Sequence, residues 1–327
     1  MKTSQFFTFF LVFLTFFSLT FSKKCHPDDK KTLLKIKKDF NNDYVFASWD
    51  PKTDCCGWYI VKCDPKTNRI IGFDLSQSDL KLPMPSAIGD LPYLESLSFH
   101  HTNLTGQIPQ SITKLSKLKF LDLKWNFLSG PIPSFLGELK NLDYLALSFN
   151  NFTGPIPSSL SKLTKLTGLL LDRNKLTGKI PESFSQFQAN DFYLYLSHNQ
   201  LSGQVPRTLG HVNFSWIDIS RNKLEGDISF LFGKDKFTNI YDFSRNMLQF
   251  DMSKLEFPKT MTKLDLNHNK IFGSLPKDLA KFDYLNLNVS YNRLCGKIPV
   301  SERLQELDYT NYFHNKCLCG APLPACK

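Results

Sequence analysis

Aspartates recur in the second half of the chain at a spacing that would stack their carboxylates. Asp218, Asp242 and Asp265 follow one another at intervals of 24 and 23 residues, each between two apolar residues. Carboxylates about 5 Å apart have the spacing of a retaining glycosidase. A regular row on an open surface, however, lacks the pocket that raises the pKa of an acid catalyst. The sequence also has no phosphate loop, nucleophile elbow or zinc-protease motif, so we predict a protein that is not an enzyme.

Cysteines are the second set of residues whose type and spacing indicate a chemical role. The chain has eight, in two groups of four near its ends, with none between Cys63 and Cys295. An even number in a secreted chain indicates disulfides. A zinc site in the second group, with His314 nearby, is the alternative, and an oxidising compartment disfavours it. We expect no metal and no cofactor, and disulfides among Cys25, Cys55, Cys56, Cys63, Cys295, Cys317, Cys319 and Cys326.

The first residues indicate that compartment. Lys2 precedes an apolar run from Phe6 to Phe21, and Thr20 and Ser22 stand at the −3 and −1 positions of a signal-peptidase site. The run is shorter than the roughly 20 residues of a membrane-spanning helix. No stop-transfer helix or lipid-anchor tail follows. We predict a signal peptide and a secreted, extracellular chain without a membrane span.

An internal repeat organises the rest of the chain. The segment from Leu121 to Pro133, with the pattern L-x-L-x-x-N-x-L-x-G-x-I-P, recurs at 145–157 and 169–181. Ser78 and Thr102 stand at the asparagine position in two earlier, degenerate repeats. The asparagine itself returns in steps of 23 to 25 residues, as Asn126, Asn150, Asn174, Asn199, Asn222, Asn246, Asn269 and Asn292.

A period near 24 with this pattern is a leucine-rich repeat. We predict a right-handed, curved α/β solenoid of about ten turns, with a concave parallel β-sheet and a disulfide-bonded cap at each end. The chain divides into a signal peptide at 1–22, an N-terminal cysteine-rich cap with a helix at 23–68, the repeats at 69–300 and a C-terminal cysteine-rich cap at 301–327.

Each position of the repeat has a physical role. The two leucines form a short strand and point inward, so the residue between them faces the concave surface. The asparagine amide bonds backbone groups of neighbouring coils, which Ser and Thr do only in part. The glycine permits a backbone conformation that a Cβ would strain. The eighth turn has Phe250 in place of this glycine and lacks the proline, and we expect a local distortion there.

The first cap has its own pattern. Apolar residues at helical spacing predict a helix over 30–40, preceded by Asp28 and Asp29 as capping residues. Adjacent cysteines rarely bridge each other, so Cys55 and Cys56 are expected to reach different partners.

Three features are specific in combination. They are the cap sequence Cys55-Cys-Gly-Trp58, ten repeats with Leu-Ser/Thr-Gly-x-Ile-Pro, and the double-cysteine tail from Phe313 to Cys326. Together they resemble the plant polygalacturonase-inhibiting proteins over essentially the whole chain after the signal peptide. The resemblance implies a plant cell-wall location and inhibition of fungal endo-polygalacturonases through the concave face. It also implies the disulfide pairs Cys25–Cys55, Cys56–Cys63, Cys295–Cys317 and Cys319–Cys326.

Two columns of residues would form the concave face. One holds the residue between the strand leucines, and the other holds the residue just before the repeated asparagine. The stacked aspartates would form an acidic stripe, whose mutual repulsion Arg221, Arg245 and His268 on the same turns offset. The predicted contact residues are Asp122, Lys124, Trp125, Phe149, Asp172, Arg173, Tyr195, His198, Asp218, Arg221, Asp242, Arg245, Asp265 and His268.

The acidic stripe suggests a basic partner. An enzyme that cuts an acidic polysaccharide presents a basic cleft, which the stripe and aromatic residues such as Trp216 would fill. The alternative is that aspartate at this position is a neutral filler of the repeat. Ala146 and Leu170 interrupt the stripe in the middle of the arc.

The net charge of +10 suggests an acidic partner as well. Outside the cell this partner is an acidic polymer rather than a nucleic acid. De-esterified pectin is the candidate, held by Arg173, Arg221 and Arg245 and released by salt. We expect a monomer. Two other functions fit the same fold: a soluble receptor-like module that binds another protein, a peptide or pectin, and an ice-binding relative.

Four N-glycosylation sequons complete the sequence pattern. A glycan in the concave column would obstruct docking, so we expect the last of the four sites to be unmodified. The sequon asparagines are Asn103, Asn151, Asn213 and Asn288.

Overall fold

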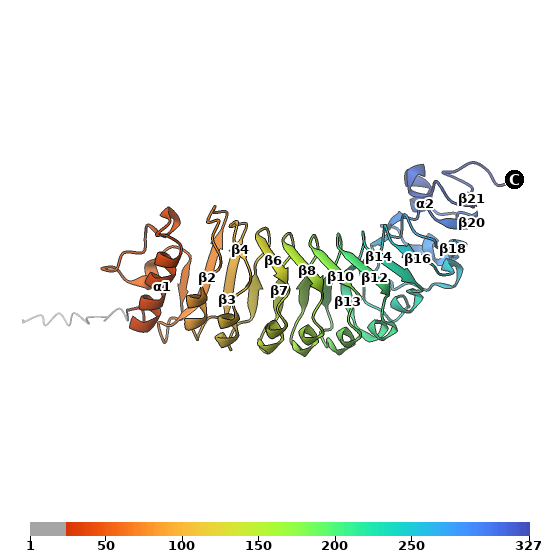
Figure 1. Cartoon of the computed structure of the whole chain (residues 1–327). Helices are drawn as coiled ribbons and strands as arrows, with labels where there is room; N and C mark the ends of the chain where they lie inside the picture. Colours follow the sequence, from red (N-terminus) through yellow and green to blue (C-terminus); the bar gives the residue numbers. More distant parts are fainter. Residues whose placement is uncertain (1–23) are drawn as a thin grey trace, which may run out of the picture.

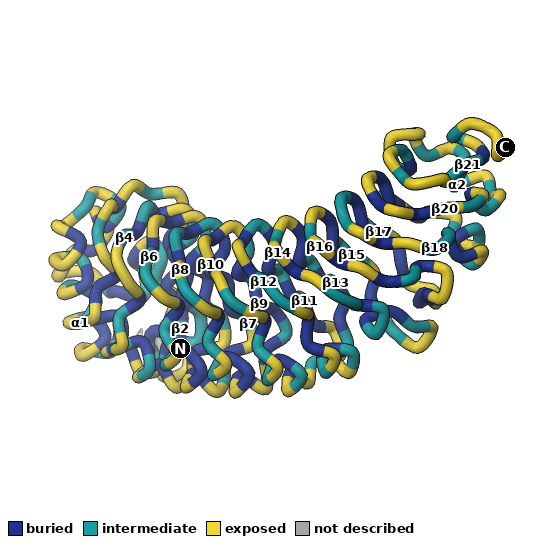
Figure 2. Tube along the Cα trace, turned by 45° about the vertical axis from the view of Figure 1, so that its right-hand side comes forward, coloured by how far each residue is buried: buried dark blue, intermediate teal, exposed yellow. Residues whose placement is uncertain are grey.

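The computed structural model of the chain describes residues 24–327. The expected signal peptide therefore lies outside the described residues. The rest forms a solenoid of stacked coils that runs from α1 (Pro27–Asp39) to the C-terminal cap and curves into an arc (Figures 1 and 2). In the described part of the chain, no helix is long and apolar enough to cross a membrane.

One side of every coil contributes a strand to an eleven-stranded sheet, here called the long sheet. Its first strand, β1 (Val61–Cys63), belongs to the cap and pairs antiparallel with β2. The other ten strands are parallel, which confirms the ten predicted turns. They are β2 (Ile70–Ser76), β3 (Ser96–His100), β5 (Phe120–Asp122), β7 (Tyr144–Ala146), β9 (Gly168–Leu170), β11 (Phe192–Tyr195), β13 (Phe214–Asp218), β15 (Ile240–Asp242), β17 (Lys263–Asp265) and β19 (Asn286–Asn288).

A second sheet of seven strands follows the repeated asparagines, and the sequence analysis did not predict it. Six of these strands include the repeat glycine, which lies at or near the strand end with φ between +75° and +83°, a region that favours glycine. The strands are β4 (Thr105–Gly106), β6 (Phe127–Pro131), β8 (Asn151–Pro155), β10 (Lys175–Gly178), β12 (Gln200–Gln204), β14 (Lys223–Gly226) and β16 (Met247–Leu248).

The second sheet stops at the eighth turn, where the sequence predicted a distortion. Phe250 replaces the glycine there, and it is not among the residues with positive φ. A separate three-stranded sheet begins one turn later with β18 (Phe272–Gly273), β20 (Arg293–Lys297) and β21 (Cys317–Cys319). The irregular turn therefore divides this side of the solenoid into two sheets.

Short 3-10 helices connect the two sides of the coils, most of them starting after a proline. Each buries at least one apolar side chain against the core, such as Ile112, Leu136 or Met252. They are η3 (Ser86–Asp90), η4 (Gln110–Lys114), η5 (Ser134–Glu138), η6 (Ser158–Lys162), η7 (Glu182–Gln186), η8 (Arg207–His211), η9 (Ser229–Leu231), η10 (Met252–Lys254) and η11 (Lys277–Lys281).

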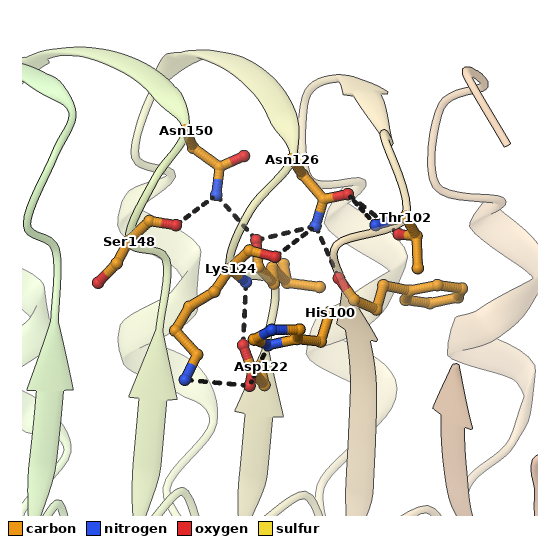
Figure 3. A network of polar contacts seen from close by, with 9 residues as sticks. His100, Thr102, Asp122, Lys124, Asn126, Ser148 and Asn150 are labelled. Carbon is orange, nitrogen blue, oxygen red and sulfur yellow. Dashed lines mark hydrogen bonds and ion pairs between the residues drawn. The ribbon is translucent and has the colours of Figure 1, made fainter. Parts of the chain in front are cut away.

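The asparagine ladder joins each coil to the one before it. Asn174 donates from Nδ2 to the carbonyls of Leu147 at 3.0 Å and Leu171 at 3.1 Å, and its Oδ1 accepts from the N–H of Phe152 at 3.0 Å. Figure 3 shows the corresponding bonds at Asn126 and Asn150. One side chain thus satisfies backbone groups that have no strand partner at the turn.

Both ends of the ladder differ from the sequence prediction. Asn315, 23 residues after Asn292, adds a further rung by donating to Val289 O at 3.0 Å and accepting from Leu294 N at 3.0 Å. At the other end, Thr102 donates its hydroxyl to Asn126, and the Ser78 hydroxyl is buried without a partner. The ladder therefore extends into the C-terminal cap and weakens toward the N-terminal one.

The N-terminal cap corrects one prediction. α1 begins at Pro27 with the His26 side chain as its cap, rather than at 30 behind two capping aspartates. Proline is favoured at the first helical position, because its missing N–H would be unpaired there in any case. Asp29 is instead buried in the first turn, where it accepts from Arg69 Nη2 at 2.6 Å and Ile70 N at 2.9 Å.

Disulfides close both caps with the pairing that the resemblance implies. They join Cys25 to Cys55, Cys56 to Cys63, Cys295 to Cys317 and Cys319 to Cys326. The remaining elements of the caps are η1 (Tyr44–Phe46), η2 (Cys55–Gly57), α2 (Glu302–Glu306) and η12 (Tyr309–Asn311). Each bridge is local, so each cap is covalently closed near the end of the stack.

Replacing a central rung tests the ladder. Asn174→Ala leaves one N–H and three carbonyls without their side-chain partner, and we expect it to lower the free energy of unfolding by about 2–4 kcal/mol. Urea denaturation followed by circular dichroism measures this. Lys175→Ala, at the exposed neighbouring position, is the matched control. Equal loss in the two variants would contradict the structural role of the ladder.

Candidate binding surface

The long sheet presents four columns of side chains, one residue per coil in each. We call them the first, second and third columns and the ridge. In the coil that contains β5, their members are Phe120, Asp122, Lys124 and Trp125, in that order. Strand register aligns the residues of the second column from Asp74 to Asn288. This places the carboxylates of Asp218, Asp242 and Asp265 on neighbouring strands, as predicted.

The acidic second column is half-buried and tied to the backbone. The Oδ1 atoms of Asp122 and Asp218 accept from the N–H two residues ahead at 2.9 and 3.0 Å. Burial, and then the neighbouring Asp242 carboxylate, raise the pKa values of Asp218 and Asp265. These aspartates therefore cap their own turns.

The cations that neutralise the column differ from those predicted. Lys263 Nζ lies 2.9 Å from Asp242 Oδ2, and Lys124 Nζ lies 3.4 Å from Asp122 Oδ2. Arg221 and Arg245 form no ion pair with any described carboxylate. The reason is the path of the chain: the ridge lies beyond the end of the strands, whereas Lys263 lies in β17 and Lys124 follows Asp122 by only two residues.

A small polar network surrounds Asp122 (Figure 3). His100 Nδ1, from the preceding coil, lies 3.3 Å from Asp122 Oδ2. Lys124, two residues after Asp122, places its Nζ 3.4 Å from the same oxygen. One coil further, the Ser148 hydroxyl donates to Asp172, and burial raises the pKa of that carboxyl. The N-terminal part of the sheet thus carries a compensated charge cluster rather than an isolated acid.

The first column is aromatic at four positions in the middle of the sheet, Phe120, Tyr144, Tyr193 and Trp216, and of these the sequence predicted only Trp216. Phe120 and Tyr144 stack with ring centroids 4.9 Å apart and planes within 4°. Next in register is Gly168, where an added Cβ would lie 2.7 Å from Tyr144 Cδ2. The sequence signal for this column is an aromatic residue just before the first strand leucine or isoleucine, which recurs at the same period as the other columns.

Aromatic and apolar residues therefore fill the middle of the sheet. Ala146 and Leu170 interrupt the acidic column on β7 and β9, where the first column has Tyr144 and Gly168, and Tyr193 follows in register on β11. Tyr193 is 42% exposed, and the centroids of the Tyr195 and Trp216 rings lie 5.0 Å apart with their planes tilted by 42°. The result is a centre whose first and second columns are apolar or aromatic, with Asp122 on one side and Asp218 to Asp265 on the other.

The ridge consists of residues in the left-handed backbone region, from Gln77 to Tyr291, with φ between +51° and +58°. Non-glycine residues rarely adopt it, and the sequence pattern did not predict it. Trp125 and Phe149 stack at 3.6 Å, and Arg173 lies 5.0 Å from the Phe149 ring. At the other end, His268 and Tyr291 stack at 4.0 Å. Ordering of rings along the solenoid is a consequence of this shared backbone conformation.

Cationic residues occupy the middle of the ridge. His198 lies between Arg173 and Arg221 in the column, and its buried Nδ1 has no hydrogen-bond partner. Burial, followed by these two arginines, lowers its pKa. The ridge therefore places a histidine with a lowered pKa between permanent positive charges.

Three of the sequons lie off the strands of the long sheet, and the fourth lies on it. Asn103, Asn151 and Asn213 are partly buried. Asn288 ends β19 in the second column, where its Oδ1 accepts from Ser290 N at 3.1 Å. A glycan on Asn288 would cover the acidic end of the sheet.

Comparisons with known proteins point to one family. The model described as leucine rich repeat N-terminal domain matches residues 26–64, and the leucine rich repeat matches 93–115, 117–139, 141–163, 165–187, 192–212 and 260–282. Polygalacturonase inhibitor 2 of Arabidopsis thaliana is 55% identical over 98% of this chain and 98% of its own. The polygalacturonase inhibitor of Pyrus communis is 56% identical over 100% of this chain and 99% of its own.

A solved structure is also similar. The crystal structure of a plant ice-binding protein has a TM-score of 0.91 and 48% identity, covering 93% of this chain and 99% of that one. The similarity to inhibitors and leucine-rich repeat proteins indicates an inhibitor or binding protein rather than an enzyme.

The raised pKa of Asp265 predicts the pH dependence of its contribution to folding. The folded chain holds this proton more tightly than the unfolded chain, so stability from Asp265 is full below its ordinary pKa of about 3.9. That stability is lost as the pH rises through the folded-state pKa. Asp265→Asn, which copies Asn288, should therefore gain stability relative to the wild type as pH rises from about 3 to 7.

Urea unfolding at the two pH values measures this difference. Asp278→Asn is the opposite-sign control, because Lys281 lowers the pKa of Asp278 and its stabilising effect is lost as pH falls. A difference between Asp265→Asn and the wild type that does not change with pH would contradict the raised pKa.

Proposed function

The chain belongs to the polygalacturonase inhibitor family of leucine-rich repeat proteins, and from this premise we propose what it binds and how. It is a secreted plant cell-wall defence protein that binds and inhibits fungal endo-polygalacturonases. The face of the long sheet, which the sequence predicts to be concave, is the docking surface. The observation that carries this proposal is the apolar, aromatic centre between two groups of carboxylates.

The arrangement has the composition of a protein-binding surface. Interfaces place aromatic residues at their centre and charges toward the rim. Tyr193 and Trp216 would supply the anchors here, and Leu170 the apolar floor between them. The matching patch on the partner is apolar, with positive charge on both sides.

The charge supports the choice of partner. A polygalacturonase must hold a polyanion, so its substrate cleft is basic, and carboxylates attract such a cleft from a distance. Backbone hydrogen bonds already fix Asp218 and Asp242 in place. Because these side chains lose little freedom on docking, more of the interaction energy remains for affinity. Covering the cleft excludes the polysaccharide, which is the inhibitory step.

The ridge supports a second contact, with de-esterified pectin. Arg173, Arg221 and Arg245 repeat along the solenoid axis and form no ion pair with described residues. A polyuronate chain running along the ridge would pair its carboxylates with these guanidinium groups. Retention on pectate, lost in about 0.5 M salt because screening is then strong, tests this contact separately from inhibition.

Ice binding is the second candidate function, and one observation favours it besides the similar structure. The second sheet carries a hydroxyl residue at the same position of five successive coils, as Thr105, Ser129, Thr153, Thr177 and Ser202. The exposed Lys175 and Lys179 interrupt the surface around this row. Thermal hysteresis of the purified protein distinguishes the two functions.

Inhibition and its charge dependence test the main proposal. A panel of fungal endo-polygalacturonases is assayed for reducing-sugar release with the wild type and with Asp218→Asn/Asp242→Asn. Asparagine keeps the capping hydrogen bonds, as Asn288 does, and removes the two negative charges together with the Asp242–Lys263 ion pair. We expect the double variant to lose about tenfold or more in affinity, with a smaller salt dependence, since each close charge pair contributes about 1.5 kcal/mol or more.

The matched control is Glu182→Gln, at an exposed position in η7. It removes one negative charge away from the long sheet and should inhibit like the wild type. Undiminished inhibition by the folded double variant would move the docking surface away from the second column. If the folded wild type inhibits no enzyme of the panel, the proposed function is wrong.

A further inference from the structure

A hollow of about 340 Å³ lies beside the N-terminal end of the ridge. Three aromatic side chains line it, Trp125, Phe127 and Phe149. Trp125 is 45% exposed and Phe127 is 53% exposed. Large apolar side chains gathered at a surface usually mark a contact, and the strand columns of the docking surface do not include these three.

Asn151 is part of the lining of the same hollow. It begins the sequon Asn151-Phe-Thr153 and stands two residues after Phe149. The residue between them, Asn150, is a buried rung of the ladder, so Phe149 and Asn151 are held on either side of a fixed point. The Asn151 amide has no hydrogen-bond partner within residues 24–327, and it is partly exposed.

We propose that Asn151 carries an N-glycan whose first N-acetylglucosamine packs on Trp125, Phe127 and Phe149. The oligosaccharide is transferred from a lipid diphosphate: the bond from Nδ2 to C1 of the sugar forms, the C1–O bond to the diphosphate breaks, and one amide proton is released. The C–H groups on one face of the sugar ring then cover the aromatic rings and remove apolar surface from water.

Asn103 also lines this hollow but is less suited to the role. Its Nδ2 donates to Asp79 Oδ1 at 2.6 Å, a bond that a glycan would break. Asn213 lies outside the hollow, with Ser215 of its sequon bonded to Asp191 at 2.8 Å. The three sequons therefore differ, and Asn151 alone combines a free amide with an aromatic floor in the part of the chain that the structure describes.

This inference changes the role of two predicted contact residues. Trp125 and Phe149 become a seat for the chain's own glycan, and partner contacts shift to the strand columns. The proposal uses the secretory route of the proposed function but not its inhibitory activity. Glycopeptide analysis and enzyme inhibition are separate measurements, so either can fail alone.

The experiment compares Asn151→Gln with the wild type, both secreted from a plant expression host. Mass spectrometry of the wild type should find glycan on Asn151. Loss of the glycan should raise acrylamide quenching of tryptophan emission, since Trp125 is the exposed tryptophan while Trp49 and Trp58 are buried. The variant should also melt about 2–4 °C lower, the shift that corresponds to about 1 kcal/mol.

Two controls isolate the packing. Asn213→Gln should leave quenching unchanged, and trimming the wild type to a single N-acetylglucosamine should preserve its melting temperature. In a Phe127→Lys/Phe149→Arg background, Asn151→Gln should no longer lower the melting temperature. The two background substitutions copy Lys175 and Arg173, which belong to the coil after Asn151. An unoccupied Asn151 in the secreted protein, or an equal loss in both backgrounds, overturns the proposal.

Discussion

The rest of this structure depends on satisfying the backbone at the turn that follows each strand of the long sheet. At that point the chain leaves one sheet, and its N–H and C=O groups have no partner in a regular ladder of strands. A single buried asparagine per coil bonds both its own turn and the preceding coil. Because the bonds are between coils, no coil is stable alone, and stability belongs to the stack and its caps.

The same constraint positions the binding surface. The residue before each asparagine is driven into the left-handed backbone region, which turns its side chain outward beyond the strand ends and creates the ridge. The strand residues keep their alternation, so their outward side chains form columns in register about 4.8 Å apart. One ladder therefore spaces rings, carboxylates and guanidinium groups at the repeat distance of the coils.

The aspartates of the second column have two roles that oppose each other. Their hydrogen bonds to the following turn help to end the strand, while burial and mutual repulsion raise the pKa values of Asp218 and Asp265. A basic partner relieves that repulsion. The charge that weakens the free protein is thus the charge available for binding, which is a common cost of a preorganised surface.

The sequence by itself determined the solenoid, the number of its turns, the ladder from Asn126 to Asn292 and the membership of the second column. These follow from strictly local periodicity, in which equal spacing along the chain becomes equal position in space. It also placed the distortion at Phe250, because this turn lacks the glycine that favours the positive φ of the other repeats.

Only the tertiary structure decided which charges meet and which rings stack. Lys263 rather than Arg221 pairs with the acidic column, Tyr144 lies over Gly168, and Asn151 opens into an aromatic hollow. Each of these depends on side-chain direction and on contacts between neighbouring coils. A one-dimensional period aligns residues but does not say toward which neighbour each side chain turns.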